Sequence, residues 1–310
     1  MAWGEIEGAG FEAVEPEFRR LHPSSARVER LWTGGRWLEG PAWFAAHRLL
    51  VFSDIPNDRM LRHDEASGLT AVWRSPARHS NGNTVDREGR LVTCEHGSRS
   101  VTRTEHDGRV TVLADRFEGR RLNSPNDVVV ASDGGVWFTD PAYGIDTDYE
   151  GHRAPMEQDG CHLYRIDPSG EVRRVASDFA RPNGLAFSPD EATLYVADTG
   201  ATHAEGGPRH IRAFGVEDLG GGRLSGGGVW AACAAGLFDG FRVDTEGRVW
   251  TSAADGVHCL APSGALLGKI RLPETVANLA FAGPDRNRLM ICATSSLYAV
   301  FVHARGAARG

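Results

Sequence analysis

The chain has 310 residues, of which 41% are hydrophobic and 24% are charged, a balance typical of a soluble globular protein with a large core. The formal charge of −7, from 34 basic and 41 acidic residues, argues against nucleic acid or an anionic membrane surface as a partner. The 38 glycines predict many tight turns and therefore many short strands.

The five cysteines predict buried, reduced thiols. Their number is odd and they form no CxxC pair, which argues against a disulfide framework or a zinc–thiolate site. The first residues are acidic and lack the apolar stretch of a signal peptide. No apolar run approaches the ~18 residues that a membrane span needs. We therefore expect a cytoplasmic protein that has no membrane partner and is a monomer or a weak homo-oligomer.

One pattern recurs six times along the chain. Each copy starts with an acidic or amide side chain, usually followed by Gly, and continues as two strand-like runs joined by a turn rich in Asp, Gly and Arg. In chain order, the copies span residues 39–54, 81–97, 126–144, 183–200, 239–256 and 278–296. Their first residues are 42, 45, 57, 56 and 39 positions apart, which is close to the period of a propeller blade.

A second hairpin pattern lies between the copies. Examples are residues 62–73, 103–114, 164–176 and 258–270. Two hairpins make four antiparallel strands per unit, so the sequence predicts an all-β fold, a six-bladed β-propeller with four-stranded antiparallel blades. An irregular β-sandwich is the alternative, but it predicts no residue that returns six times in register.

The two ends of the chain are predicted to close the ring. Only one strand, 297–303, remains after the sixth copy, and residues 26–34 resemble the outer strand of the following blade. We predict that 26–34 completes the last blade and removes an exposed sheet edge. In chain order, the expected parts are a cap segment at 1–25 with a helical turn near Glu15–Leu21, one propeller at 26–303, and a C-terminal tail at 304–310.

The first strands of propeller blades line the central channel and run in the same direction, so the residues that open the six copies are expected to meet at one mouth. These anchor residues are Glu39, Asn81, Asn126, Asn183, Asp239 and Asn278. All of them offer oxygen, which favours one divalent cation, with Ca²⁺ ahead of Zn²⁺, Mn²⁺ or Mg²⁺. Gly follows the anchor in four copies and allows the backbones to crowd the channel axis.

Two alternatives remain open for the anchors. The Asn-Gly and Asp-Gly pairs are also ordinary turn signals, although in this chain they open strands instead of joining them. Asn81 and Asn278 could touch the metal, touch the substrate or only brace a neighbouring side chain.

The second strand of each hairpin returns to the same mouth with further polar side chains. These are Asp54, Glu95, His96, Asp140, Asp198 and Asp255. We predict that Tyr143 packs on a ring-shaped ligand, and that His96 and Arg99 orient an anionic or hydroxylated one. The full set of predicted substrate contacts is Asn81, His96, Arg99, Asn126, Asp140 and Tyr143.

Five motifs resemble, in order, the gluconolactonase / senescence-marker-protein-30 / luciferin-regenerating-enzyme family over about residues 30–300. They are EGPAW at 39–43, LNSPNDVV at 122–129, WFTDPAYG at 137–144, RPNGLAFSPD at 181–190 and DGFRVD at 239–244. The resemblance implies a six-bladed propeller with one catalytic divalent metal in the channel mouth. It makes Glu39, Asn183 and Asp239 metal ligands, and it makes Asn126 a ligand of the metal or a contact of the substrate.

We therefore expect a metal-dependent lactonase, a gluconolactonase-type carboxylic ester hydrolase that opens a small-molecule sugar lactone to its aldonic acid. The metal would polarise the carbonyl, and Asp239 would act as general base. A phosphotriesterase-like hydrolase on the same metal site and a non-enzymatic propeller binding module are the alternatives. The individual lactone stays open.

Overall fold

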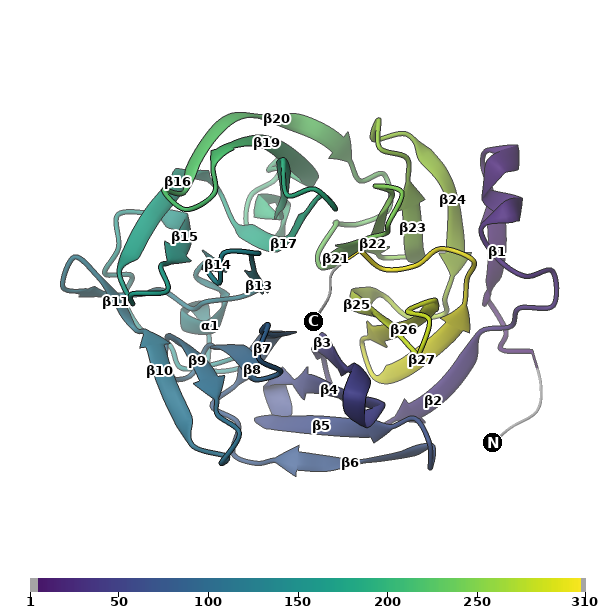
Figure 1. Ribbon diagram of the computed structural model, residues 1–310, viewed down its shortest axis with the longest axis horizontal. Coiled ribbons are helices and arrows are strands. Elements are labelled where there is room, and N and C mark those ends of the chain that lie inside the picture. Colours follow the sequence, from purple (N-terminus) through teal and green to yellow (C-terminus); the bar gives the residue numbers. More distant parts are fainter. Residues whose placement is uncertain (1–4, 308–310) are drawn as a thin grey trace.

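A computed structural model describes residues 5–307 and arranges six sheets as blades around a central channel (Figure 1). Each blade contains four antiparallel strands, and one blade carries a fifth. This confirms the predicted six-bladed propeller. Residues 1–4 and 308–310, the outermost parts of the predicted cap and tail, lie outside the described residues.

Five blades are built from consecutive strands that follow one another from the channel outward. The first is β3 (Leu38–Phe44), β4 (Leu49–Asp54), β5 (Arg59–Asp64) and β6 (Leu69–Arg74). The second is β7 (Ser80–Val85), β8 (Leu91–Glu95), β9 (Ser100–Thr104) and β10 (Val110–Ala114). The third is β13 (Val128–Val130), β14 (Val136–Asp140), β15 (Cys161–Ile166) and β16 (Val172–Phe179). The fourth is β17 (Pro182–Phe187), β18 (Thr193–Asp198), β19 (His210–Asp218) and β20 (Arg223–Ala232). The fifth is β21 (Phe241–Val243), β22 (Val249–Ala253), β23 (Gly256–Leu260) and β24 (Leu266–Arg271).

The sixth blade is completed by a strand from the other end of the chain. Its own strands are β25 (Val276–Ala282), β26 (Arg288–Ala293) and β27 (Ser296–Phe301). Strand β2 (Glu29–Thr33) then adds antiparallel to the outer edge of β27. The predicted closure of the ring by an N-terminal strand is therefore confirmed, and β2 covers an edge that would otherwise be exposed.

Residues before β2 pack on the outside of the fifth blade. Strand β1 (Gly10–Ala13) pairs with β24 as the additional strand. The 3₁₀ helix η1 (Pro16–Arg20) buries Phe18 completely, and the Phe18 ring lies 6.3 Å from that of Trp250. This outer segment therefore contributes to the core between the fifth and sixth blades.

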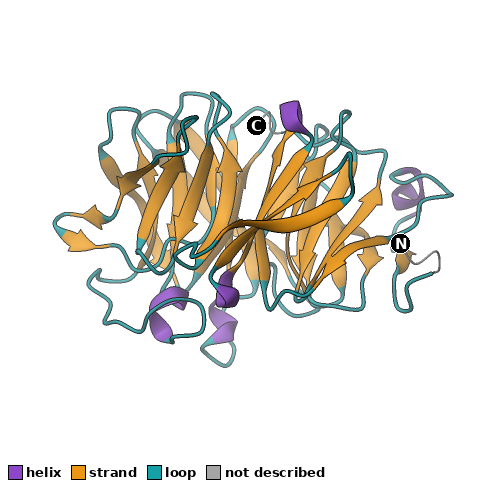
Figure 2. Ribbon diagram, turned by 90° about the horizontal axis from the view of Figure 1, so that it is seen from below, coloured by secondary structure: helices purple, strands orange, loops and turns teal. Residues whose placement is uncertain are grey.

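Figure 2 shows the strands running between two faces of the disc, from which loops and short helices project. Besides η1, the helices are η2 (Ala45–His47), η3 (Ile55–Asn57), α1 (Tyr143–Asp146) and η4 (Gly200–Thr202). Strands β11 (Arg116–Phe117) and β12 (Arg120–Arg121) form a separate short hairpin. No helix in residues 5–307 is long and apolar enough to cross a membrane.

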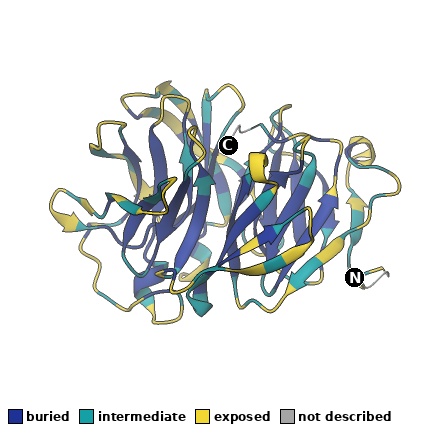
Figure 3. Cartoon of the chain, turned by 60° about the horizontal axis from the view of Figure 1, so that its bottom comes forward, coloured by how far each residue is buried: buried dark blue, intermediate teal, exposed yellow. Residues whose placement is uncertain are grey.

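Apolar side chains fill the gaps between neighbouring blades. Each of six hydrophobic clusters combines residues of two adjacent sheets; Tyr195 and Ile211 of the fourth blade, for example, share a cluster with Phe241 of the fifth. Figure 3 shows these buried inner strands and the more exposed outer strands and loops. All five cysteines are free and buried, as predicted. The blade-to-blade contacts hold the inner strands, and the residues at their ends, around the channel.

Candidate metal and substrate site

The six anchor residues lie at one mouth of the channel, at or just before the start of each innermost strand. Glu39, Asn81, Asn183 and Asn278 lie near the starts of β3, β7, β17 and β25, and Asn126 and Asp239 each lie two residues before β13 and β21. The innermost strands all lead away from this mouth towards the opposite face. The common position follows from the repeat, because each copy enters its blade in the same way.

An irregularity in strand pairing accompanies the anchor in four blades. The register shifts occur between Glu39 and Ala42, between Ser80 and Asn83, between Pro182 and Leu185, and between Val276 and Asn278. A bulge re-aims the side chain that it carries and ends regular pairing. In the first, second and fourth blades it separates the anchor from the regular ladder that continues down the strand, whereas Asn278 of the sixth blade follows the shift and pairs with Cys292.

Glycine after the anchor lets neighbouring blades approach closely. A Cβ atom on Gly184 would lie 2.2 Å from the backbone oxygen of Asp239, and one on Gly82 would lie 2.4 Å from that of Asn126. The Gly82 N–H also donates to the Asn126 carbonyl at 2.8 Å. Consecutive anchors are therefore in backbone contact around the axis, as the sequence predicted from the absence of a Cβ.

Asn278 braces Glu39. The Asn278 Nδ2 donates to Glu39 Oε2 at 3.0 Å, and the Gly40 N–H donates to the same oxygen at 2.6 Å. The Asn278 Oδ1 accepts the Leu279 N–H at 2.8 Å. With both ends of its amide engaged, Asn278 holds a neighbouring carboxylate, one of the possibilities that the sequence left open.

The carboxylates at this mouth are buried together. Burial, and then the charge of Asp127, raises the pKa of Glu39 to about 8. Burial, and then the charge of Glu39, raises the pKa of Asp239 well above its ordinary value. The nearest compensating charge is Arg242, whose Nη1 lies 3.8 Å from Asp127 Oδ2. Such a cluster of repelling carboxylates suits a divalent cation, which would favour their ionised forms.

Besides the carboxylates, side-chain amide oxygens at this mouth could bind a cation. The buried Asn81 Oδ1 has no hydrogen-bond partner among the described residues. The Asn183 side chain hydrogen-bonds to Asp239, and its Nδ2 donates to Thr199 Oγ1 at 3.2 Å. Residues 5–307 contain no group of three or more His, Cys, Asp or Glu side chains arranged for a metal. A cation at this mouth would therefore need amide oxygens as well as the Glu39 and Asp239 carboxylates, and such a set of hard oxygen donors would suit Ca²⁺.

With this geometry in place, comparison with known proteins identifies the family. Residues 37–295 match the family described as the SMP-30/gluconolactonase/LRE-like region. The chain belongs to this family. A gluconolactonase of Zymomonas mobilis is 30% identical over 281 residues, which cover 82% of this chain and 75% of that protein. Pentonolactonase XacC of Haloferax volcanii is 29% identical over 270 residues, which cover 84% of this chain and 82% of that protein.

Solved structures of this family agree in fold. The structure of a gluconolactonase from Xanthomonas campestris superposes with a TM-score of 0.89 at 37% sequence identity, and covers 96% of each chain. The family resemblance predicted from five motifs is therefore confirmed over most of the chain.

In this member of the family, His96 holds Asn81 and a loop at the mouth. The Asn81 Nδ2 lies 3.2 Å from His96 Nε2, and His96 Nδ1 lies 3.0 Å from the Glu150 carbonyl oxygen. Burial lowers the pKa of His96 to about 4, so the ring is neutral at pH 7. A neutral ring that donates from Nδ1 accepts from Asn81 at Nε2, which leaves the Asn81 Oδ1 free to face a ligand.

Several acidic side chains at the ends of second strands accept hydrogen bonds from backbone N–H groups. Asp140 is fully buried and accepts the Asn123 N–H at 2.8 Å. Asp198 accepts the Arg181 N–H at 2.8 Å, and Asp54 accepts the Arg36 N–H at 3.0 Å. In each case the carboxylate holds the segment that leads into the first strand of its own blade. Asp140 therefore holds the segment that precedes Asn126.

Arg99 and Tyr143 are also engaged by neighbouring protein groups. The Arg99 Nε donates to the Leu122 carbonyl at 2.7 Å, next to the segment that carries Asn126. The Tyr143 hydroxyl lies 2.7 Å from Thr199 Oγ1, and burial raises its pKa to about 12. The Asp239 charge also acts on Tyr143, so this ring lies near the carboxylates.

The sequence did not single out Asp127, Arg242 or Glu150. Asp127 occupies a position where most other copies have Gly, and that departure was a usable signal. Arg242 follows Asp239 by three residues and gave no signal of its own. Glu150 lies in the long loop between β14 and β15, and its charge raises the pKa of Asp239. Burial raises the pKa of Glu150 itself to about 7.

Proposed function

We propose that the protein is a divalent-cation-dependent lactonase that hydrolyses a sugar lactone of the gluconolactone type to the aldonic acid. The observation that carries the proposal is the meeting of two buried carboxylates and several amide oxygens, from distant repeats, at one channel mouth. Family membership and the lactonases among the relatives support a lactone-hydrolysing esterase. The cytoplasmic location, and a monomer or weak homo-oligomer as the assembly, stay predictions.

Four residues would hold the cation: Glu39, Asn126, Asn183 and Asp239. When bound, the cation supplies Lewis-acid polarisation of the lactone carbonyl. We prefer Ca²⁺ because all the donors are hard oxygens, and Zn²⁺, Mn²⁺ and Mg²⁺ are the alternatives. Asn278 keeps the Glu39 carboxylate in place through the hydrogen bond at 3.0 Å.

Asp239 acts as general base in this proposal. Its carboxylate takes a proton from the attacking water, whose oxygen bonds to the carbonyl carbon while the ring C–O bond breaks. The proton then passes to the ring oxygen, which leaves as a hydroxyl, so the product is the aldonic acid. Asn183 orients Asp239 through their side-chain hydrogen bond. A lactone carbonyl is electrophilic, so a carboxylate is a sufficient base.

Substrate hydroxyls are held by polar groups around the carboxylates. The unpartnered Asn81 Oδ1 can accept a hydrogen bond from a sugar hydroxyl. Asn126 belongs to the neighbouring blade, where its carbonyl accepts the Gly82 N–H, and Tyr143 lies close enough to Asp239 for that charge to act on it. The neutral His96 keeps the Asn81 amide oriented. Arg99 and Asp140 contribute by fixing the segment before Asn126.

Metal-dependent acid release tests the proposal. Purified protein is dialysed against EDTA and assayed with glucono-δ-lactone and a panel of other lactones, with spontaneous hydrolysis subtracted. We expect chelation to abolish the enzymatic rate and one divalent cation to restore it. A rate that resists chelation contradicts the metal role, and no rate with any lactone contradicts the lactonase assignment. Hydrolysis of an aryl phosphotriester in preference to every lactone would favour the phosphotriesterase alternative.

A further inference from the structure

Asn183 has a free amide oxygen at the mouth of the channel. The residue is buried, and within residues 5–307 its Oδ1 accepts no hydrogen bond. The register shift between Pro182 and Leu185 takes Asn183 out of the regular ladder between β17 and β18. The direction of the amide oxygen is therefore set by the groups that the side chain contacts, and not by strand pairing.

The nitrogen end of this amide meets two acceptors. Asn183 Nδ2 donates to Thr199 Oγ1 at 3.2 Å. Burial raises the pKa of Asp239, and a hydrogen bond from the Asn183 side chain acts in the opposite direction, because it favours the ionised carboxylate. An ionised carboxylate only accepts hydrogen bonds, so the amide presents its nitrogen to Asp239. With both N–H groups engaged, Oδ1 is left for a ligand.

The Thr199 hydroxyl is itself fixed as an acceptor towards Asn183. Thr199 is only 1% exposed and directly follows β18. Its Oγ1 donates to the Arg181 carbonyl at 3.2 Å, and the same carbonyl accepts the Thr199 N–H at 3.0 Å. The single hydroxyl hydrogen is therefore used. The lone pairs of Oγ1 are left for the Asn183 amide and for the Tyr143 hydroxyl, which lies 2.7 Å away.

A reversed Asn183 amide would lose both of its contacts. Its Oδ1 would face the Thr199 oxygen, whose hydrogen is donated to Arg181, and the Asp239 carboxylate, which has no hydrogen to donate when ionised. Unmade hydrogen bonds of buried groups are costly. The surrounding groups therefore select one orientation of the amide before any cation binds.

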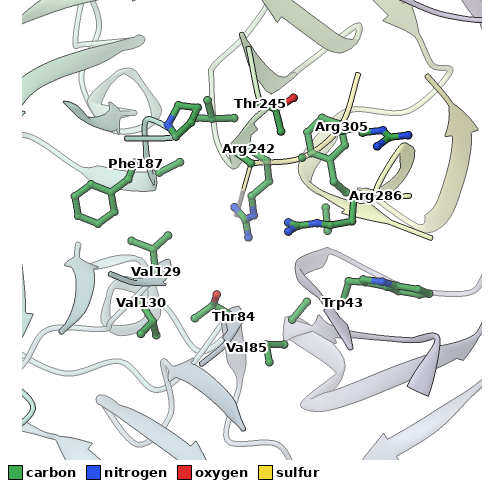
Figure 4. A pocket seen from close by; sticks show the side chains of 18 of the residues that line it. Trp43, Thr84, Val85, Val129, Val130, Phe187, Arg242, Thr245, Arg286 and Arg305 are labelled. Carbon is green, nitrogen blue, oxygen red and sulfur yellow. The ribbon is translucent and has the colours of Figure 1, made fainter. Parts of the chain in front are cut away.

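Further down the channel, no described residue holds the Asn183 amide. A cavity of about 770 Å³ lies towards the other end of the channel, and Figure 4 shows the apolar side chains of Val129 and Phe187 beside it. Phe187 ends β17, whereas Asn183, near the start of the same strand, is not among the described residues that line this cavity. The amide is therefore held from the mouth, by Thr199 and Asp239.

We propose that Thr199 is a positioning residue of the candidate cation site, and that its hydroxyl holds the Asn183 amide with the oxygen towards the cation. The inference rests on the proposed function, in which Asn183 is a ligand of the cation. Replacing a residue that orients a metal ligand through a hydrogen bond typically weakens metal binding by about 10–100-fold. Thr199 was not among the residues that the sequence predicted at the mouth.

Calorimetric titration with metal ions tests the proposal without using activity. The original protein, dialysed against EDTA and then buffer, is titrated with Ca²⁺, Zn²⁺, Mn²⁺ and Mg²⁺, and the variants are compared with the cation that it binds most tightly. We expect Thr199→Val, which keeps the shape of the side chain but has no hydroxyl, to bind this cation at least about tenfold more weakly. The smaller Thr199→Ala should behave in the same way. Thr199→Ser keeps the hydroxyl and should bind nearly as tightly as the original protein.

The matched control is Thr202→Val. Thr202 is exposed and belongs to η4, and its hydroxyl also lies beside that of Tyr143, at 3.0 Å, but it makes no described contact with Asn183. This variant should bind the cation like the original protein. Thermal unfolding without added metal confirms that each variant is folded.

An Asn183→Ala background shows whether Thr199 acts through Asn183. In that background Thr199→Val should weaken cation binding no further, because the amide that Thr199 orients is gone. Undiminished binding by folded Thr199→Val or Thr199→Ala, equally weak binding by Thr199→Ser, or a further full loss in the double variant would overturn the proposal. An original protein that binds none of the four cations would contradict the cation site itself, and this inference with it.

Discussion

At the residue scale, the candidate site depends on carboxylates that are costly to bury without a cation. Burial and repulsion within the cluster raise the pKa of Glu39 and of Asp239. Such repulsion destabilises the fold, and buried carboxylates with raised pKa values are typical of functional sites.

The variant Asp239→Asn tests whether Asp239 acts as the general base, as opposed to the protein being a binding module without catalytic activity. We expect lactone hydrolysis to fall at least about a hundredfold, because the amide cannot accept the proton. The fold should survive, because the substitution removes a negative charge from a repelling cluster. The matched control is Asp107→Asn, in an exposed turn, which should retain full activity. A folded Asp239→Asn protein with full activity would contradict the general-base role, and a lack of lactonase activity in the original protein would favour a binding module.

Asp140→Asn tests the role of the buried strand-end carboxylate through pH. Burial raises the pKa of Asp140 to about 7, above the ~3.9 of an unfolded chain. Its contribution to stability is therefore present below pH ~4 and is lost as the pH rises to about 7. We expect the unfolding free energy of Asp140→Asn to decline less between pH 5 and pH 8 than that of the original protein, as measured by urea titration. Parallel pH profiles of the two proteins would contradict this.

At the scale of the element, the important unit is an anchor followed by glycine at the start of an innermost strand. The bulge beside the anchor separates its side chain from the regular ladder, and the glycine allows the backbone of the next anchor to approach. Because the same unit returns in successive blades, a substitution in one unit should disturb its neighbour.

Gly184→Ala tests this contact. Its Cβ would lie 2.2 Å from the Asp239 oxygen, so the two strands must separate. We expect a loss of about 1–3 kcal/mol in unfolding free energy and reduced lactonase activity, since Asp239 moves. The control is Gly228→Ala in β20, where a Cβ meets nothing within 4 Å. Equal behaviour of the two variants in denaturant titration would show that the close approach does not matter.

At the scale of the whole molecule, two features stabilise the ring of blades. Clusters of apolar side chains pack between all neighbouring blades, and one strand closes the ring. The closure joins β2 to β27, with Thr33 opposite Ser296 and their hydroxyls 3.1 Å apart. Two residues 263 positions apart in sequence therefore lie opposite each other on paired strands. The geometry of the channel mouth depends on this closure, because it fixes the sixth blade beside the first.

A disulfide across this closure should stabilise the ring. Thr33→Cys with Ser296→Cys places two thiols at facing positions of an antiparallel pair. We expect the oxidised double variant to gain about 2–4 kcal/mol relative to its reduced form, because the link restricts the unfolded chain. The five native cysteines are buried and should not interfere. Identical melting temperatures with and without reductant, in a protein shown to be cross-linked, would contradict this.

Much of the architecture could be predicted from sequence because it is encoded locally. Alternating strand residues and Asp/Gly turns mark each hairpin, and their repetition gives the number of blades. The closing strand was found because residues 26–34 resemble the outer strand of another blade. The six anchors were found because the same residue types return in register.

The roles of individual polar side chains depended on contacts between distant parts of the chain. In sequence, Asn278 is equivalent to Asn183, yet the structure uses its whole amide to hold Glu39 and the backbone. Asp140 was predicted to contact the substrate. In the structure its carboxylate accepts a hydrogen bond from the Asn123 N–H.

The sequence by itself determined the hairpins, the blade count and the oxygen-rich mouth, because strand alternation and turn chemistry act between near neighbours. Only the tertiary structure decided which anchors have free oxygens, where Asp127 and Arg242 meet, and that a cavity lies at the far end of the channel. The physical reason is that hydrogen-bond partners and enclosed volume are set by the packing of blades far apart in the chain.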